Sequence, residues 1–438
     1  VMQGFLQGFS AAELSAFAAA AYGNGKFSHP DVAPVRPVDG NTWCLELWHG
    51  PTCAFKDMAL QIMPHLLSGA LEKTGVKGDA FILTATSGDT GKAALDGYHD
   101  VPRVRIMVFY PVYGVSRVQK LQMSTQEGEN VMVCPVKGNF DDTQTGVKRI
   151  FTDPEANKYL AERGYFFSSA NSINWGRLAP QIVYYVSAYC DMIASGRLKL
   201  GEQLDVSVPT GNFGDIFAAY IAKRCGLPLG RLVCASNKNR ILTDFLATGT
   251  YDRNRDFYTT MSPSMDILIS SNLERMLYYM SDKDTRLISM LMNDLSQWGA
   301  YEVPEPMMKK IRSIFGTGWA DENQVREMIA DCWNKNHYVI DPHTACGYYV
   351  MQQMPRDPLT PRVLLSTASP YKFPRVVNES LGLDASGTDF ECMDVLAKAT
   401  GTTAPAALRG LETADVRFDN VVEIDGMEGF VEQAAKAL

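Results

Sequence analysis

The stretch AFILTATSGDTG, residues 80–91, decides the fold class, because it joins an apolar run to a loop of small and polar residues. Residues 80–85 favour a β-strand, and the loop leads into a helical pattern that starts at Lys92. Similar apolar runs, each expected to form a strand, follow at residues 104–110, 131–136, 204–208, 232–235 and 363–366. Strands that alternate with helices predict an α/β protein with mostly parallel sheets.

The composition points to a globular enzyme. Of the 438 residues, 46% are hydrophobic and 21% are charged. The net charge of -8 disfavours nucleic acid and anionic membrane surfaces as partners. No stretch is long and apolar enough to span a bilayer, and no secretory signal is present. The chain opens at Val1 and not at Met, so we expect the natural N-terminus to lie further upstream.

The cysteines indicate a reducing compartment. There are nine of them, with no C-x-x-C pair and no spacing typical of a zinc site, so we expect no metal centre and no disulfide framework. We therefore expect reduced thiols and a cytoplasmic location.

Three loops carry the candidate chemistry, and each follows an expected strand. In HGPTCAFKD (residues 49–57), Lys56 follows a turn and is flanked by apolar residues, which favours a neutral, nucleophilic amine. In TSGDTG (86–91) and GNFGD (211–215), glycines and hydroxyls at a helix start can bind an anion. Taken alone, Lys56 is more simply a surface charge, and either loop could be an ordinary helix start.

Together these pieces resemble threonine synthases, which are fold type II pyridoxal-phosphate (PLP) enzymes with a fold like that of the tryptophan synthase β subunit. The pattern HGPTxAFKD covers residues 49–57, LTATSGDTG covers 83–91, and SVPTGNFGD covers 207–215. Further similar stretches are SSANSIN (168–174), DILISSNLER (266–275) and DPHTA (341–345). Two residues depart from the usual pattern, Cys53 and Lys92. Asp89 stands where many fold type II enzymes have Asn, and an Asp at this position resembles the enteric and yeast-like subgroup of threonine synthases.

The resemblance implies a reaction and a set of roles. The family converts O-phospho-L-homoserine and water to L-threonine and phosphate, the last step of threonine biosynthesis (EC 4.2.3.1). Lys56 would hold PLP as a Schiff base and move protons. The other cofactor contacts implied are Gly211, Asn212, Phe213, Gly214, Asp215, Thr367 and Asp89. The substrate contacts implied are Ser87, Thr90, Thr86 and Asn171.

The resemblance also implies two lobes with helical additions. We expect an N-terminal helical segment over residues 1–40, and a small α/β lobe over 86–164. The large PLP-binding lobe is expected over 41–85 and 165–438, with a helical insert at about 270–354. A monomer or a homodimer is expected.

Other activities remain open at this point. A phospholyase would share Lys56 and the loops but would release a keto acid, and a serine/threonine dehydratase would act on free threonine. A non-catalytic α/β protein could keep the loops for an anion alone. Lys120, Arg177 and Arg275 could bind the substrate phosphate, but each is more simply a structural or solvated charge.

Overall fold

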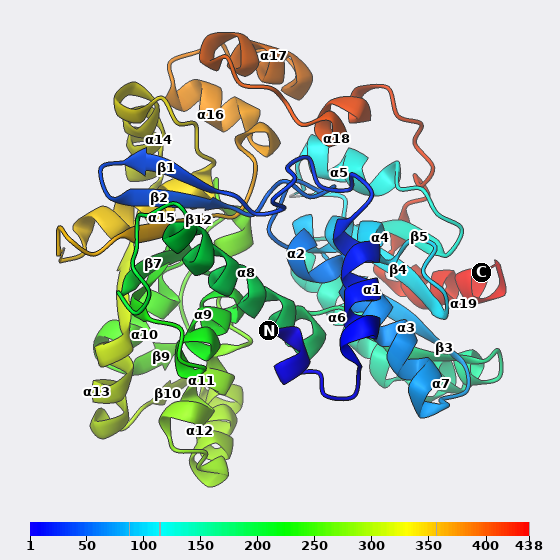
Figure 1. Ribbon diagram of the computed structural model, residues 1–438. Coiled ribbons are helices and arrows are strands. Elements are labelled where there is room, and N and C mark those ends of the chain that lie inside the picture. Colours follow the sequence, from blue (N-terminus) through cyan, green and yellow to red (C-terminus); the bar gives the residue numbers. More distant parts are fainter. Residues whose placement is uncertain (87, 114, 356, 438) are drawn as a thin grey trace. The chain divides into compact units, whose positions relative to one another are not determined.

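The computed structural model describes residues 1–86, 88–113, 115–355 and 357–437 (Figure 1). The chain forms two compact units. The first unit contains residue 1, residues 33–48 and residues 181–403; the second contains residues 2–32, 49–180 and the chain from Ala404 onward. No helix in the described ranges is long and apolar enough to cross a membrane.

The second unit is built on a five-stranded parallel sheet with the order β13-β5-β4-β3-β6. Its strands are β3 (Asp79–Ala85), β4 (Val104–Pro111), β5 (Val131–Lys137), β6 (Tyr165–Ser168) and β13 (Val422–Glu423). Its helices are α1 (Ala11–Tyr22), α2 (Asp57–Leu60), α3 (Met63–Thr74), α4 (Asp89–Tyr98), α5 (Arg117–Ser124), α6 (Phe140–Thr152), α7 (Pro154–Ala161), α18 (Ala406–Arg409) and α19 (Met427–Ala437).

Both faces of this sheet are buried, which explains the continuous apolar run in the sequence. Ile82 and Ile106 belong to one core cluster, whereas Phe81 and Met107 belong to another. Because successive side chains of a strand point to opposite faces, the two clusters lie on opposite faces of the sheet. Helix α4 packs against β4 with the first cluster, and α6 packs against β3 and β4 with the second.

The first unit is built on a six-stranded sheet with the order β1-β2-β12-β7-β8-β11, parallel except for the β1-β2 pair. Its strands are β1 (Val35–Asp39), β2 (Thr42–Glu46), β7 (Leu204–Pro209), β8 (Leu229–Ser236), β11 (Phe315–Trp319) and β12 (Arg362–Ser366). A separate antiparallel pair joins β9 (Thr250–Asp252) and β10 (Ala300–Glu302).

The helices of the first unit follow the same alternation. They are α9 (Gly214–Arg224), α10 (Ile241–Thr248), α11 (Leu273–Met280), α12 (Thr285–Trp298), α13 (Glu305–Ile314), α14 (Glu322–Asn336), α15 (Pro342–Gln353), α16 (Pro374–Ser380) and α17 (Asp389–Thr400). Helix α8 (Trp175–Ala194) has residues on both sides of the boundary at residue 180. Helix α15 packs against β7, β8 and β12.

The expected alternation of strands and helices is confirmed. In the N-terminal segment Ser10 caps α1 and forms a complete capping box with Glu13. The units differ from the expected lobes chiefly at residues 49–85 and from 404 onward, which pack within the second unit. The reason is strand pairing: β3 lies between β4 and β6, and β13 pairs with β5.

Candidate active site

The loop that carries Lys56 is folded around the carboxylate of Asp57, which is fully buried. Thr52 donates to Asp57 twice, from its backbone N–H (2.8 Å) and from its hydroxyl (2.7 Å). Gly50 is needed here, since a Cβ at this position would lie 2.4 Å from Asp57 Oδ2. These contacts fix the backbone next to Lys56, which stands at the N-terminal end of α2.

Lys56 lies close to Asp89, the other residue on its side of the site for which the resemblance implies a cofactor contact. Its Nζ lies 3.7 Å from Asp89 Oδ2 and 5.0 Å from the ring centre of Phe55. Only 9% of the surface of Lys56 is exposed, and Asp89 is buried at the first position of α4. A lysine that is screened from water and paired with a carboxylate is a candidate for a reactive amine.

In the loop between β3 and α4, the first threonine, Thr86, makes hydrogen bonds within the loop itself. The Thr86 hydroxyl accepts the N–H groups of Gly88 (3.0 Å) and Gly91 (2.9 Å), so Thr86 shapes the loop. Thr90 is half-buried, and its hydroxyl has no hydrogen-bond partner among the residues that the structure describes. Ser87 lies outside the described residues. Asn171 is exposed and accepts a long hydrogen bond of 3.4 Å from the Thr84 hydroxyl.

The loop between β7 and α9 has the features of an anion cradle. Phe213 takes a left-handed conformation (φ 63°) immediately before the helix. No hydrogen bond joins the N–H groups of Asn212, Phe213 and Gly214 to an acceptor within the described part of the chain. N–H groups at a helix N-terminus bind phosphates and carboxylates well, because the helix dipole adds to the hydrogen bonds.

The carbonyl groups of the same loop are engaged on its other side. Ser270 donates to the carbonyl of Gly211 (2.9 Å). Asn272 donates to the carbonyl of Asn212 from both its backbone and its side chain, each at 3.0 Å. These two residues come from the DILISSNLER stretch, and their role as supports of the loop could not be read from the sequence.

Asp215 follows the loop and is buried with two tyrosines. The hydroxyls of Tyr184 (2.5 Å) and Tyr185 (2.6 Å) both donate to Asp215 Oδ1. Burial, followed by the charge of Asp215, raises the pKa of both phenols well above their usual range. Tyr184 and Tyr185 are core residues, and their hydrogen bonds tie that core to Asp215 at the start of α9.

Thr367 follows the last residue of β12 and is 5% exposed. Its neighbour Ser366 accepts a hydrogen bond of 3.0 Å from the indole N–H of Trp48. The end of β12 is thereby fixed, and with it the backbone that leads to Thr367.

The basic candidates for a substrate phosphate have contacts within the protein. Lys120 donates to the carbonyl of Val112 (2.6 Å), and Arg275 donates to Asn272 (2.5 Å). Arg177 donates to the carbonyl of Ala170 (3.1 Å), and burial lowers its pKa to about 10. Burial also lowers the pKa of Arg275.

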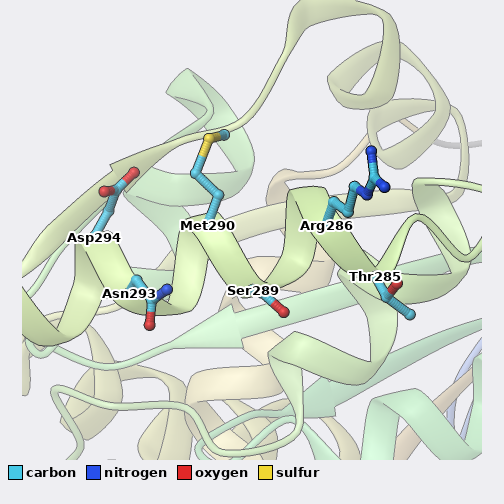
Figure 2. A pocket seen from close by; sticks show the side chains of 6 residues that line it. All are labelled: Thr285, Arg286, Ser289, Met290, Asn293 and Asp294. Atoms are coloured by element: carbon cyan, nitrogen blue, oxygen red, sulfur yellow. The ribbon is translucent and has the colours of Figure 1, made fainter.

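A separate pocket of about 460 Å³ lies along one side of α12 (Figure 2). Its lining side chains all come from this one helix: Thr285, Arg286, Ser289, Met290, Asn293 and Asp294. None of them belongs to a motif singled out in the sequence, and Met290 is exposed at its rim. The pocket is a groove on the helix surface and brings no reactive groups together.

Comparison with known proteins identifies the family. Residues 344–431 match the family model described as threonine synthase, C-terminal. The human protein threonine synthase-like 1 is 42% identical to this chain over 85% of the chain, and the match covers 50% of the human protein, so the chain spans about half the length of that relative. Threonine synthase of Pseudomonas aeruginosa is 40% identical, with 81% of this chain and 73% of that protein covered.

A solved structure supports the same assignment across nearly the whole chain. The structure of PLP-bound threonine synthase from Brucella melitensis has a TM-score of 0.86 and 36% identity to this chain. The match covers 97% of this chain and 85% of that chain. The expected α/β architecture of fold type II is thus confirmed. The chain belongs to the threonine synthase family.

Proposed function

We propose that this protein is a PLP-dependent threonine synthase, which converts O-phospho-L-homoserine and water to L-threonine and phosphate. The observation that carries the proposal is the buried Lys56 with its Nζ 3.7 Å from Asp89. Family membership supports the proposal, and so does the likeness to the PLP-bound threonine synthase from Brucella melitensis.

The residues present fit PLP. The unbonded N–H groups of Asn212, Phe213 and Gly214 suit the phosphate, which is a dianion. The Lys56 amine suits the aldehyde, and Asp89 can bond to the phenolic oxygen. The Thr367 hydroxyl suits the ring nitrogen as a neutral partner. PLP supplies an electron sink for the carbons of a bound amino acid.

In this proposal the protein orients the substrate and moves its protons. Thr90 and the backbone of its loop bind the substrate carboxylate, because α4 starts there and its dipole favours an anion. Lys56 takes the proton from the substrate Cα and returns it at the end of the reaction, and the same amine also moves the proton at Cβ. The oxygen of water is added at Cβ, and the substrate loses its γ-phosphate.

Product analysis tests the proposed reaction. Purified protein with PLP and O-phospho-L-homoserine should give threonine and phosphate in equal amounts, and Lys56→Ala should give neither. Formation of 2-oxobutyrate without threonine would make the protein a phospholyase and contradict the proposal. Turnover of free threonine, with no reaction of the phosphorylated substrate, would make it a dehydratase.

A binding measurement separates catalysis from anion binding alone. PLP that is joined to a lysine absorbs visible light, so the purified protein should be yellow and Lys56→Ala should not be. A protein that binds phosphate ions at the loop but stays colourless with added PLP would be an anion-binding protein.

We also propose that the protein works in the cytoplasm as a monomer or a homodimer. The sequence supports this location, because its nine cysteines include no C-x-x-C pair and no pattern of a disulfide framework. Light scattering of the PLP-loaded protein tests the assembly, and a tetramer or larger species would contradict this part.

A further inference from the structure

The carboxylate of Asp341 stands at the start of two hydrogen-bonded chains within the first unit. Asp341 is fully buried and caps α15, where it accepts the N–H groups of His343 (2.9 Å) and Thr344 (3.0 Å). A cap alone does not require a charge, since an uncharged Ser or Asn caps a helix equally well. A fully buried carboxylate carries a desolvation penalty that a cap alone does not explain.

The first chain leads to the anion loop. Asp341 Oδ2 lies 2.6 Å from His343 Nδ1, and His343 Nε2 accepts the backbone N–H of Ser264 (3.2 Å). Because Nε2 accepts, the ring proton is on Nδ1 and points to Asp341. The carbonyl of Ser264 lies directly against Gly211, where a Cβ would come within 2.6 Å of it. This chain of hydrogen bonds therefore ends at the backbone of Ser264, which packs against Gly211 in the loop of residues 211–214.

The second chain leads to Thr367. The Thr344 hydroxyl donates to Asp341 Oδ1. It also lies 3.2 Å from the hydroxyl of Ser366, the residue before Thr367. Since Ser366 is bonded to Trp48 as well, its side chain has little freedom to turn. Asp341 is thus linked through His343 and Ser264 to the loop of residues 211–214, and through Thr344 and Ser366 to the backbone of Thr367.

We propose that Asp341 is a positioning residue that sets two distant parts of the cofactor site, the phosphate loop through His343 and the ring-nitrogen contact through Thr344. This inference rests on the proposed PLP function of residues 211–214 and Thr367. The DPHTA stretch thereby has a role besides starting a helix. Both carboxylate oxygens of Asp341 are required as acceptors, because Oδ2 faces Nδ1 of His343 while Oδ1 accepts the hydroxyl of Thr344.

Two spectroscopic signals of the PLP-loaded protein test the two chains separately. The ³¹P chemical shift of bound PLP reports the phosphate loop, and the visible absorption maximum reports the ring. His343→Phe should move the ³¹P signal and leave the absorption maximum in place, whereas His343→Gln, which keeps an acceptor for Ser264, should restore the signal. Thr344→Val should move the absorption maximum alone, and Thr344→Ser should restore it.

Asp341→Asn should move both signals and raise the dissociation constant of PLP about tenfold, the effect of losing one hydrogen bond to a charged group. Asp284→Asn is the matched control, because the Asp284 carboxylate caps α12 by accepting two backbone N–H groups and makes no other hydrogen bond among the described residues. It should move neither signal. If Asp341→Asn does not fold, the His343 and Thr344 variants still decide the question.

The outcomes separate this inference from the proposed function. If the unmodified protein binds no PLP, the proposed function fails. If it binds PLP but His343→Phe and Thr344→Val move both signals together or move neither, the protein keeps its function and the role of Asp341 is wrong.

Discussion

Gln119 donates a hydrogen bond of 2.9 Å from its side-chain amide to Asp89 Oδ1, the oxygen of that carboxylate other than the one facing Lys56. Gln119 also completes the capping box of α5 with Ser116. One glutamine therefore closes a helix end and fixes the partner of the candidate reactive lysine. The resemblance predicts a cofactor contact for Asp89, but nothing in the sequence indicates Gln119, because residues 30 positions apart meet only in the folded chain.

The first prediction concerns Gly88, which has a φ of 148° and lies against Gln119. A Cβ at Gly88 would come within 2.4 Å of Gln119 Nε2, so Gly88→Ala should displace Gln119 as well as strain the backbone. We expect a loss of about 1–3 kcal/mol in the free energy of unfolding, measured with urea, and slower PLP uptake. Gly164→Ala is the control: Gly164 also has a positive φ (80°) but no atom near its Cβ position. It should lose stability and keep the rate of PLP uptake. Equal PLP uptake by both variants would contradict the role of Gln119.

The second prediction concerns Asn272, which donates twice to the carbonyl of Asn212. Asn272→Ala removes the side-chain bond and leaves the loop less fixed, so the dissociation constant of PLP should rise about tenfold. An absorbance titration of the apoprotein measures it. Asn254→Ala is the matched control, since the Asn254 amide also donates to a backbone carbonyl, that of Trp298 (2.9 Å). An unchanged PLP affinity in Asn272→Ala would show that the loop does not need this support.

The third prediction concerns the acid stability of the second unit. His65 lies on α3, and burial, followed by the charge of Lys26, lowers its pKa below the usual 6.5. The unfolded chain therefore binds a proton more readily than the folded chain, and stability falls as the pH drops from 6.5 through the pKa of the folded state. His65→Leu should flatten the dependence of unfolding free energy on pH in this window. An unchanged dependence in His65→Leu would show that His65 does not set the slope in this window.

The fourth prediction concerns the thiols. Cys190 and Cys225 are exposed, and the other cysteines are buried. A thiol reagent should therefore modify two cysteines rapidly in the native protein and all nine after denaturation. Cys190→Ser should reduce the number of rapidly modified cysteines in the native protein by one. Fewer than nine reactive thiols after denaturation without reductant would indicate a disulfide.

Much of the fold could be predicted because most of its central strands are buried on both faces. Such strands appear in the sequence as unbroken apolar runs. The strand β11 could not be predicted, since its five-residue sequence FGTGW contains two glycines, which are unfavourable inside a strand. It forms because it pairs in parallel with β8, a contact between residues about 80 positions apart. Likewise β13 has only two residues and exists through its pairing with β5.

The candidate site likewise contains residues that sequence motifs mark and residues that only tertiary contacts bring together. Lys56, Asp89 and the loop of residues 211–214 could be found because short motifs mark them. The supports Gln119, Ser270 and Asn272 could not be assigned a role, because their partners are set by tertiary contacts. Thr86 was expected to contact substrate, a role that stays a prediction, and the structure shows its hydroxyl bonded to its own loop.

The return of the C-terminal segment to the second unit has a consequence for the order of folding. Met427, Val431 and Ala434 are buried in the same cluster as Phe81 and Met107. During synthesis on the ribosome, this side of the sheet therefore has no complete cover until some 300 further residues have been made after β4. We expect the nascent second unit to expose an apolar sheet face throughout that interval, and so to depend on chaperones more than a unit formed from one continuous segment.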